Sequence, residues 1–209
     1  ESRFPVSTWL KGMLVDGIYR LNLEPPVLRK PSPPGQPSAF RPNGSNLPWV
    51  IEDLKRADFD SYSAWTGHVR SALPDIESVN TVERREDRAR YLLVRYRGGL
   101  EVPSWMVSDG TLRFLALSLP AFLPGYDKTY LIEEPENGIH PEAVEHLYAF
   151  LRSAVESQVL VTTHSPVILE TAEPDRVLCF SKNREGASQI VSGEQHPALR
   201  NGRQGDLFA

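Results

Sequence analysis

Apolar and polar positions follow two different periods along this chain. Between residues 141 and 155, apolar side chains recur three and four positions apart, which predicts an amphipathic helix with Pro141 at its first position. Segments 128–132 and 159–163 are instead short runs rich in apolar residues, which is typical of strands buried inside a sheet. Strand, helix and strand in that order predict a mostly parallel sheet flanked by helices. The pattern therefore predicts an α/β fold.

The first hundred residues predict a smaller helical and antiparallel lobe. Apolar spacing favours helices at 6–15, at 59–73 and from Asn46 or Leu47 onward, and strands at 17–23, 76–82, 90–96 and 100–102. Residues 24–42 contain seven prolines, a density that predicts a connector without regular structure. The mixed charges of residues 83–90 are more typical of a solvated hairpin tip than of an element that reads DNA.

The later part of the chain predicts the rest of the α/β core. A helix is expected over 111–122, ended by Pro124 and Gly125, a short helix over 165–172, and a hairpin of 176–181 with 188–191. The expected domains are a lobe at 1–104, a core at 105–193 and a polar tail at 194–209, which ends abruptly on apolar residues.

Composition narrows the class of protein. Hydrophobic residues make up 40% and charged residues 24% of the 209, as in ordinary globular proteins. No apolar run approaches the roughly 18 residues of a membrane span, and a net charge of -4 argues against a broad nucleic-acid-binding face. The single cysteine, Cys179, is expected in a buried strand and favours the cytoplasm. Because the sequence starts at Glu1 without an initiator methionine, we expect a piece of a longer product.

Three segments carry candidate chemistry. The apolar run of residues 130–132 leads directly into Glu133 and Glu134, and adjacent carboxylates at a strand end repel each other unless a cation compensates them. Ser108-Asp109-Gly110 opens a predicted helix, where a hydroxyl and free N–H groups can bind an anion. His164 follows the next predicted strand, in the context Thr-Thr-His-Ser-Pro.

Together these segments resemble the ABC-type ATPase heads of the SMC, RecF and OLD group, in the branch whose acidic motif reads EEPENGIHP. The resemblance covers residues 107–166, where a signature loop, a Walker B strand, a D-loop and a switch histidine occur in the order of that group. It implies ATP hydrolysis with ATP and Mg²⁺ as cofactors. It also implies a homodimer of heads with ATP between them, in DNA repair or antiviral defence, together with DNA or a nuclease or other effector subunit.

The resemblance also assigns roles to individual residues. Glu133 would hold Mg²⁺, although most such heads have Asp there, and Glu134 would polarise the attacking water. The remaining assignments are the switch histidine at His164, signature-loop contacts to the facing ATP from Ser108, Asp109 and Gly110, and D-loop contacts from Asn137, Gly138, Ile139 and His140. For His140 alone, a helix N-cap is nearly as good an interpretation. Trp105 is interpreted as a packing residue and not as an adenine stacker.

No G-x-x-x-x-G-K-[ST] phosphate loop occurs, because none of the fourteen glycines is followed by lysine. We therefore interpret the chain as the C-terminal half of a head, and expect no ATP hydrolysis by this piece alone. Two other classes of function remain open. One is a catalytically inactive head that acts as an interaction module, and the other is a metal-dependent nuclease that uses Glu133, Glu134 and Glu136.

Overall fold

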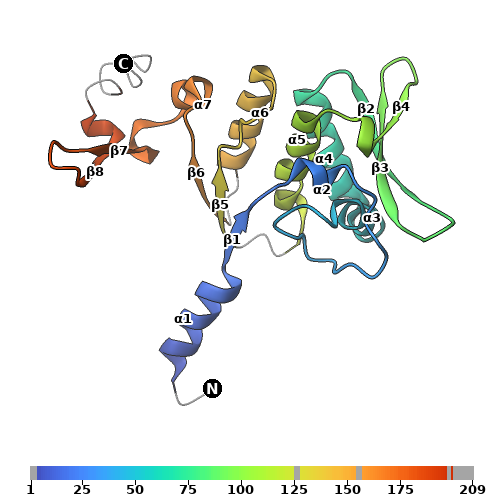
Figure 1. Ribbon diagram of the computed structural model, residues 1–209, viewed down its shortest axis with the longest axis horizontal. Coiled ribbons are helices and arrows are strands. Elements are labelled where there is room, and N and C mark those ends of the chain that lie inside the picture. Colours follow the sequence, from blue (N-terminus) through green and yellow to red (C-terminus); the bar gives the residue numbers. More distant parts are fainter. Residues whose placement is uncertain (1–3, 125–127, 154–156, 197–198, 200–209) are drawn as a thin grey trace. The chain divides into compact units, whose positions relative to one another are not determined.

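The computed structural model describes residues 4–124, 128–153, 157–196 and 199 (Figure 1). The chain divides into two compact units, Glu1–Thr163 and His164–Ala209. The first unit contains a parallel sheet, an antiparallel sheet and most of the helices, and the second contains a helix and a hairpin. The domain boundaries expected at 104/105 and 193/194 remain predictions.

The parallel sheet of the first unit consists of β1 (Ile18–Leu21), β5 (Thr129–Glu133) and β6 (Gln158–Thr162), in the order β1-β5-β6. Both pairs of neighbours are parallel, and Glu133 of β5 is in register with Thr162 of β6. The carboxyl ends of β5 and β6 therefore meet at one edge. The predicted α/β fold with a parallel sheet is confirmed.

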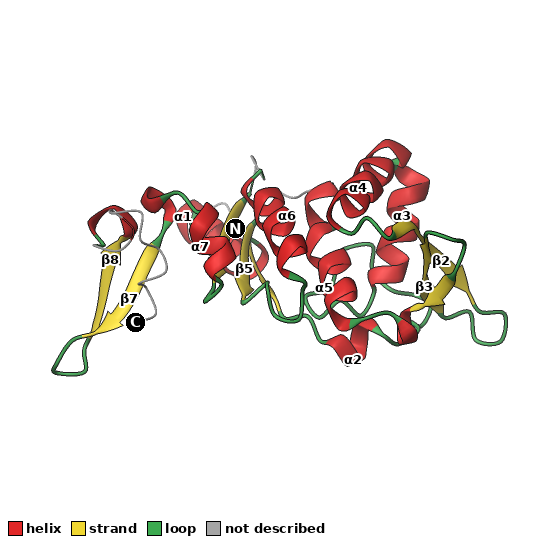
Figure 2. Ribbon diagram, turned by 90° about the horizontal axis from the view of Figure 1, so that it is seen from above, coloured by secondary structure: helices red, strands yellow, loops and turns green. Residues whose placement is uncertain are grey.

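Two of the helices predicted from the sequence, α5 (Asp109–Ser118) and α6 (Pro141–Arg152), are present beside the parallel sheet (Figure 2). α6 connects β5 to β6, and its buried face carries the predicted three-and-four spacing with Val144 and Leu147. The last residues predicted for this helix, 154 and 155, lie outside the described part. α5 ends before the predicted Phe122, because Pro120 has no N–H to continue the helix. A 3₁₀ turn, η2 (Pro120–Phe122), follows instead.

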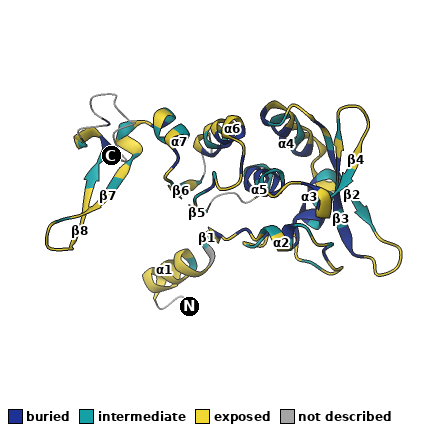
Figure 3. Ribbon diagram, turned by 45° about the horizontal axis from the view of Figure 1, so that its top comes forward, coloured by how far each residue is buried: buried dark blue, intermediate teal, exposed yellow. Residues whose placement is uncertain are grey.

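The parallel sheet is covered less completely than the sequence predicts. Tyr130 and Ile132 of β5 are buried, but no residue of β6 is fully buried and Leu160 is 50% exposed (Figure 3). Within the described residues, β6 pairs only with β5. The prediction of a buried strand at 159–163 is therefore wrong in this respect, because burial depends on an outer neighbour that these residues do not supply.

The lobe packs helices against an antiparallel sheet. α3 (Leu47–Ala57) and α4 (Phe59–Ala72) contact the sheet of β2 (Ile76–Glu83), β3 (Arg90–Tyr96) and β4 (Glu101–Pro103), which runs into a 3₁₀ turn, η1 (Ser104–Met106). Trp65 is fully buried and donates its indole N–H to Ser118 Oγ at 3.0 Å. The tip between β2 and β3, residues 84–88, is exposed, so the predicted solvated hairpin is confirmed.

The proline-rich connector is more ordered than the sequence predicts. Pro25 and Pro26 start a one-turn helix, α2 (Pro25–Leu28), because proline is tolerated where a helix has no N–H partner to lose. Farther along, the buried Asn46 side chain donates to the carbonyls of Pro37 and Ala39 at 2.9 and 2.8 Å. The prediction that this stretch holds no regular element is wrong.

The two ends of the described chain carry exposed apolar side chains. α1 (Pro5–Asp16) confirms the first predicted helix, yet Trp9 on it is 65% exposed. In the second unit, α7 (Pro166–Thr171) and the antiparallel pair β7 (Leu178–Lys182) and β8 (Ser188–Ser192) confirm the short helix and the hairpin, next to the turns η3 (Pro174–Arg176) and η4 (Gly193–Gln195). Cys179 is only half-buried, contrary to prediction, and burial raises the pKa of its thiol. The expectations for residues 206–209 lie outside the described residues.

Candidate functional site

The two predicted acids leave β5 at the edge where the carboxyl ends of β5 and β6 meet. Glu133 is the last residue of the strand and its exposed carboxylate pairs with the guanidinium of Arg20, on β1, at 2.9 Å. Both side chains of this pair are more than 60% exposed, so it contributes at most about 1 kcal/mol. The pair leaves the Glu133 carboxylate accessible to a cation that binds more tightly than Arg20.

Glu134 is held in a strained backbone conformation, with φ of +43°, which residues other than glycine rarely adopt. Four contacts fix it. Its N–H donates to the Thr162 carbonyl at 2.8 Å, and its carbonyl accepts from the Asn137 N–H at 3.1 Å and from Arg113 Nη2 at 3.2 Å. Its carboxylate accepts from the side-chain amide of Asn137. Such strain costs about 1–3 kcal/mol and persists only where the surroundings impose it.

Arg113 extends from α5 to this acidic turn, residues 133–137. It is half-buried, and burial lowers the pKa of its guanidinium although the nearby carboxylates of Glu136 and Glu134 favour its charged form. Glu136 also accepts a hydrogen bond from Thr163 Oγ1 at 2.7 Å. Neither Arg113 nor Thr163 was predicted as a site residue. For Arg113 the available signal was a lone cation between the apolar Leu112 and Phe114 of the helix.

The predicted signature loop, residues 107–110, leads into α5 and includes its first two residues. Ser108 is the N-cap: its hydroxyl accepts from the Thr111 N–H at 3.1 Å and lies 2.8 Å from Thr111 Oγ1. Ser108 therefore caps the first turn of α5. Asp109 pairs with Arg29 at 2.7 Å, so its carboxylate is already compensated.

The signature loop and the predicted D-loop, residues 137–140, lie against each other. A Cβ built on Gly110 would fall 2.0 Å from the carbonyl oxygen of Gly138, so only glycine fits at position 110. Gly138 itself has φ of +74°. A hollow of about 440 Å³ lies beside this contact, and Ser108, Gly110, Thr111, Gly138, Ile139, His140 and Leu73 line it. The structure thus brings these two predicted segments together.

The two predicted histidines are placed differently. His140 occupies the N-cap position of α6 but makes no side-chain capping bond, and it is exposed. His164 is the first residue of the second unit and is also exposed. The described chain thus brings Glu133 and Glu134 together with Asn137 on the acidic turn, and places His164 in a separate unit.

The acidic turn fits a magnesium ion that is shared with phosphates better than one held by protein alone. Among the described residues, no group of three or more His, Cys, Asp or Glu side chains could hold a metal ion. Mg²⁺ in nucleotide sites is bound through one or two carboxylates, with phosphate oxygens and waters completing its shell. The exposed carboxylate of Glu133 matches that requirement, whereas Glu134 and Glu136 are half-buried and accept hydrogen bonds from Asn137 and Thr163.

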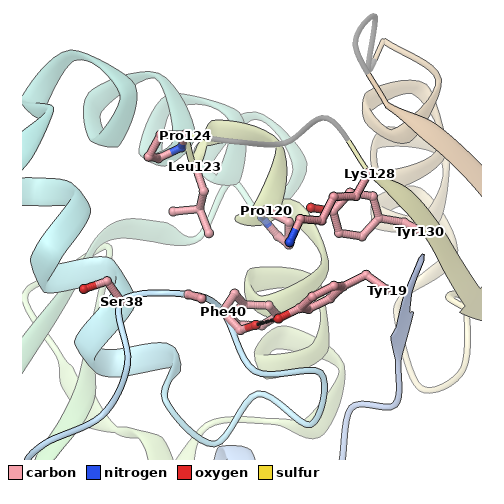
Figure 4. Close-up of a pocket in the computed structure, with 9 residues that line it drawn as sticks. Tyr19, Ser38, Phe40, Pro120, Leu123, Pro124, Lys128 and Tyr130 are labelled. Carbon is pink, nitrogen blue, oxygen red and sulfur yellow. Dashed lines mark hydrogen bonds between the residues drawn. The ribbon is translucent and has the colours of Figure 1, made fainter. Parts of the chain in front are cut away.

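A second hollow, of about 300 Å³, lies near the amino-terminal ends of β1 and β5 (Figure 4). Tyr19, Phe40, Lys128 and Tyr130 line it together with prolines and small residues, and the Tyr19 hydroxyl donates to the Phe40 carbonyl at 2.8 Å. Glu133 ends the same strand, β5, at its opposite end. The hollow is therefore separate from the acidic turn.

Comparisons with known proteins agree on the fold. One similar structure is a chain from a study of ATP-driven dimerisation and DNA-stimulated activation of SMC ATPases. It has a TM-score of 0.53 and 17% sequence identity, and the match covers 76% of this chain and 98% of that chain. An Smc head with coiled coil and joint from Pyrococcus yayanosii has a TM-score of 0.54 and 20% identity, and the match covers 74% of this chain and 31% of that chain. An Smc head bound to the C-winged helix domain of ScpA has a TM-score of 0.54 and 19% identity, and the match covers 73% of this chain and 51% of that chain.

The chain thus spans nearly all of the first of these structures but about a third and a half of the other two. The likeness shows that the fold is that of a P-loop NTPase head. No curated protein matches the sequence significantly. In the part of the chain that the structure describes, every helix is too short or too polar to cross a membrane.

The sequence itself assigns the family. A family model with the description "AAA domain, putative AbiEii toxin, Type IV TA system" matches residues 14–170, which include β1, the lobe, the signature loop, the acidic turn and β6. The match covers well over half of the 209 residues. This chain therefore belongs to that family of AAA domains.

Proposed function

We propose that this chain forms part of an ATPase head that binds ATP and Mg²⁺ between two copies and hydrolyses ATP to ADP and phosphate. One observation carries the proposal: the parallel strand β5 ends in Glu133 and Glu134, and the turn that follows packs against the signature loop through Gly110 and Gly138. Ligands in open α/β sheets bind outside the carboxyl ends of the strands, which is where this turn lies. Membership in an AAA-domain family is consistent with it.

Each residue has a role that follows from what phosphoryl transfer requires. Glu133 would hold the metal, which neutralises charge on the phosphates when it is bound. Glu134 would orient and polarise the attacking water, and its contacts with Asn137 and Thr162 support the role because they leave its backbone one conformation. His164 would donate a hydrogen bond to the terminal phosphate. This last role rests on its position in the sequence, two residues after β6.

The signature loop would serve the nucleotide of the facing head. Ser108 and the N–H group of Gly110 lie at the amino terminus of α5, where the helix dipole favours an anion. The hollow beside them, which Gly138 also lines, provides space for such a group. Closure of two heads would bring this loop to phosphates that the other head binds.

The phosphate-binding loop would come from a half of the head outside these residues. β6 supports this proposal, because it is rich in apolar residues yet has one partner among the described strands and exposes half of Leu160. A parallel strand with its loop and helix would cover such an edge. The expected domain division, with a core half at 105–193, is part of this proposal.

The proposed biological setting concerns the process in which the head acts and its partners. Antiviral defence or DNA repair, with a separate nuclease or other effector, follows from the family resemblance alone. DNA contacts would be local, since the net charge is -4. A cytoplasmic location agrees with the single cysteine. A direct nuclease role for the three glutamates is less favoured, because Glu133 and Glu134 lie at the end of a strand of a parallel sheet, a context that fits ATP chemistry better.

The test compares Glu134→Gln with the parent in the complete head, that is, with the phosphate-loop half present. We expect turnover to fall by roughly 10²–10⁴, the contribution of a general base, while ATP still binds and holds two heads together. Turnover and light scattering in ATP are measured in parallel. The 209-residue chain alone is the control and should show no turnover. A Glu134→Gln protein that hydrolyses ATP at the parent rate, or that stays monomeric, would rule the role out.

A further inference from the structure

One residue of the proline-rich connector holds the signature loop at several points. Arg29, directly after α2, places Nε 2.7 Å from Asp109 Oδ1 and donates from Nη1 to the Trp105 carbonyl at 2.9 Å. Its own carbonyl accepts from the hydroxyl of the fully buried Ser104 at 3.0 Å. Three contacts therefore join a single connector residue to Asp109 in the loop and to the turn η1 just before it.

The connector is hydrogen-bonded to the lobe close to Arg29, which restricts the position of the Arg29 backbone. Three residues after Arg29, Ser32 exchanges two backbone hydrogen bonds with Arg90, at 2.7 and 2.8 Å. The Trp49 indole N–H donates to the Ser32 carbonyl at 3.1 Å. The Arg90 guanidinium is buried between Glu52 and Glu83, at 3.1 and 2.9 Å. These bonds limit how far the Arg29 backbone can move away from the signature loop.

Asp109 presents an electrostatic difficulty that Arg29 removes. A carboxylate in the first turn of α5 interacts favourably with the helix dipole. The same carboxylate lies next to Ser108, where the proposed function requires an anionic phosphate to approach, and like charges at that distance repel. Arg29 supplies the opposite charge at 2.7 Å, and the side chains of the pair are only 33% and 52% exposed.

We propose that Arg29 is a positioning residue: it cancels the charge of Asp109 and fixes the signature loop so that the loop can receive the phosphates of the facing head. The inference rests on the function proposed above. The proline-rich connector thereby has a functional role, because its Arg29 supplies the positive charge that pairs with Asp109 of the loop. It also explains how an acid is tolerated between Ser108 and Gly110.

The main test is a charge-rescue cycle in the complete head, in a Glu134→Gln background so that hydrolysis does not separate the two copies. Arg29→Gln leaves Asp109 uncompensated and should weaken ATP-dependent association by about thirtyfold, since two loops are affected and each repulsion is worth roughly 1 kcal/mol in water. Adding Asp109→Asn should restore most of the loss, and ATP affinity of the single head should not change. The Arg29→Gln defect should grow as salt is lowered.

The matched control is Arg95→Gln, which removes an exposed pair with Glu77 on the lobe sheet at 3.2 Å. It should leave association unchanged. If Arg29→Gln associates like the parent, or if Asp109→Asn fails to rescue it, the charge-cancelling role is wrong. If the parent itself does not associate in ATP, the proposed function fails first and this inference fails with it.

Hydrogen exchange tests the positioning role without any nucleotide. In the 209-residue chain, Arg29→Gln should raise the exchange rate of the Thr111 and Leu112 amides, which donate to Ser108, several-fold, while the amides of α6 keep their parent rates. Unchanged exchange in the loop would overturn the positioning role, whatever the result with ATP.

Discussion

The lobe and the parallel sheet differ in how completely they bury their own strands. In the lobe, Leu92 and Val94 of β3 are fully buried and the guanidinium of Arg90 is paired with two carboxylates. In the parallel sheet, β6 has no fully buried residue and Leu160 is half exposed. The lobe therefore buries its central strand β3 with its own residues, whereas the edge strand β6 of the parallel sheet stays partly exposed.

The difference bears on the site, because the acidic turn connects the two regions. Arg113 of α5 reaches the Glu134 carbonyl, and Thr163, just after β6, reaches the Glu136 carboxylate. One side of the turn is thus held by a helix with a completed core, and the other by the open edge of the sheet. A segment that covers β6 would lie beside the strand whose last residue, Thr162, accepts a hydrogen bond from the Glu134 N–H at 2.8 Å.

The largest expected effect comes from the lobe core. Trp65→Ala removes a fully buried indole and leaves Ser118 Oγ without its 3.0 Å donor. We expect the free energy of unfolding to fall by about 3–5 kcal/mol, measured by urea denaturation followed by circular dichroism. Trp105→Ala is the matched control: that indole is 46% exposed and packs on Tyr91, so its cost should be much smaller. Equal costs would mean that the lobe does not bury its own core as described above.

The sequence predicted the elements well where periodicity is local. The spacing in α6 and the apolar run of β5 both placed their elements within a few residues of the observed bounds. The helix α2 was missed because density of proline was taken to exclude regular structure, although two prolines suit a first turn. The exposure of β6 could not be predicted, because it depends on which strands surround it and not on its own residues.

The candidate site was predictable in its chemical groups but not in its supports. Glu133 and Glu134 lie at the end of a strand, and Ser108 lies at the start of a helix, as the local pattern indicated. Arg29 and Arg113 come from segments 80 and 21 positions away from the residues they hold, and pairing over such distances leaves no mark in a single sequence. The Gly110–Gly138 contact was missed for the same reason.

A second prediction concerns pH and the packing that joins the lobe to the helices beside the sheet. His68 of α4 lies among Phe114, Phe122 and Phe150, with ring centroids 4.4 Å apart for the closest pair, and its Nε2 is buried without a hydrogen-bond partner among the described residues. Burial lowers the pKa of His68, and the neighbouring His146 lowers it further. The neutral imidazole is therefore the form that packs.

The lowered pKa of His68 decides how the free energy of unfolding changes with pH. Below the ordinary histidine pKa of about 6.5, the unfolded chain binds a proton that folded His68 resists, so stability is fully present above that pH and falls as the pH drops. The slope for one proton is at most about 1.4 kcal/mol per pH unit. Urea midpoints between pH 7.5 and 5 measure it, and His68→Leu should flatten the curve. An unchanged slope in that variant would assign the pH dependence to other groups.

The smallest expected effect tests the open edge itself. Leu160→Thr keeps a residue suited to a strand, and in the 209-residue chain the half-exposed side chain should change the free energy of unfolding by no more than about 0.5 kcal/mol. In the head completed by its phosphate-loop half, the same position would be buried, and the loss should rise to roughly 1–3 kcal/mol. Leu92→Thr in β3 is the matched control, because Leu92 is already fully buried and its cost should be large and equal in both forms. Urea denaturation of the four variant forms gives the comparison, and a Leu160→Thr cost that is the same with and without the added half would mean that nothing covers β6.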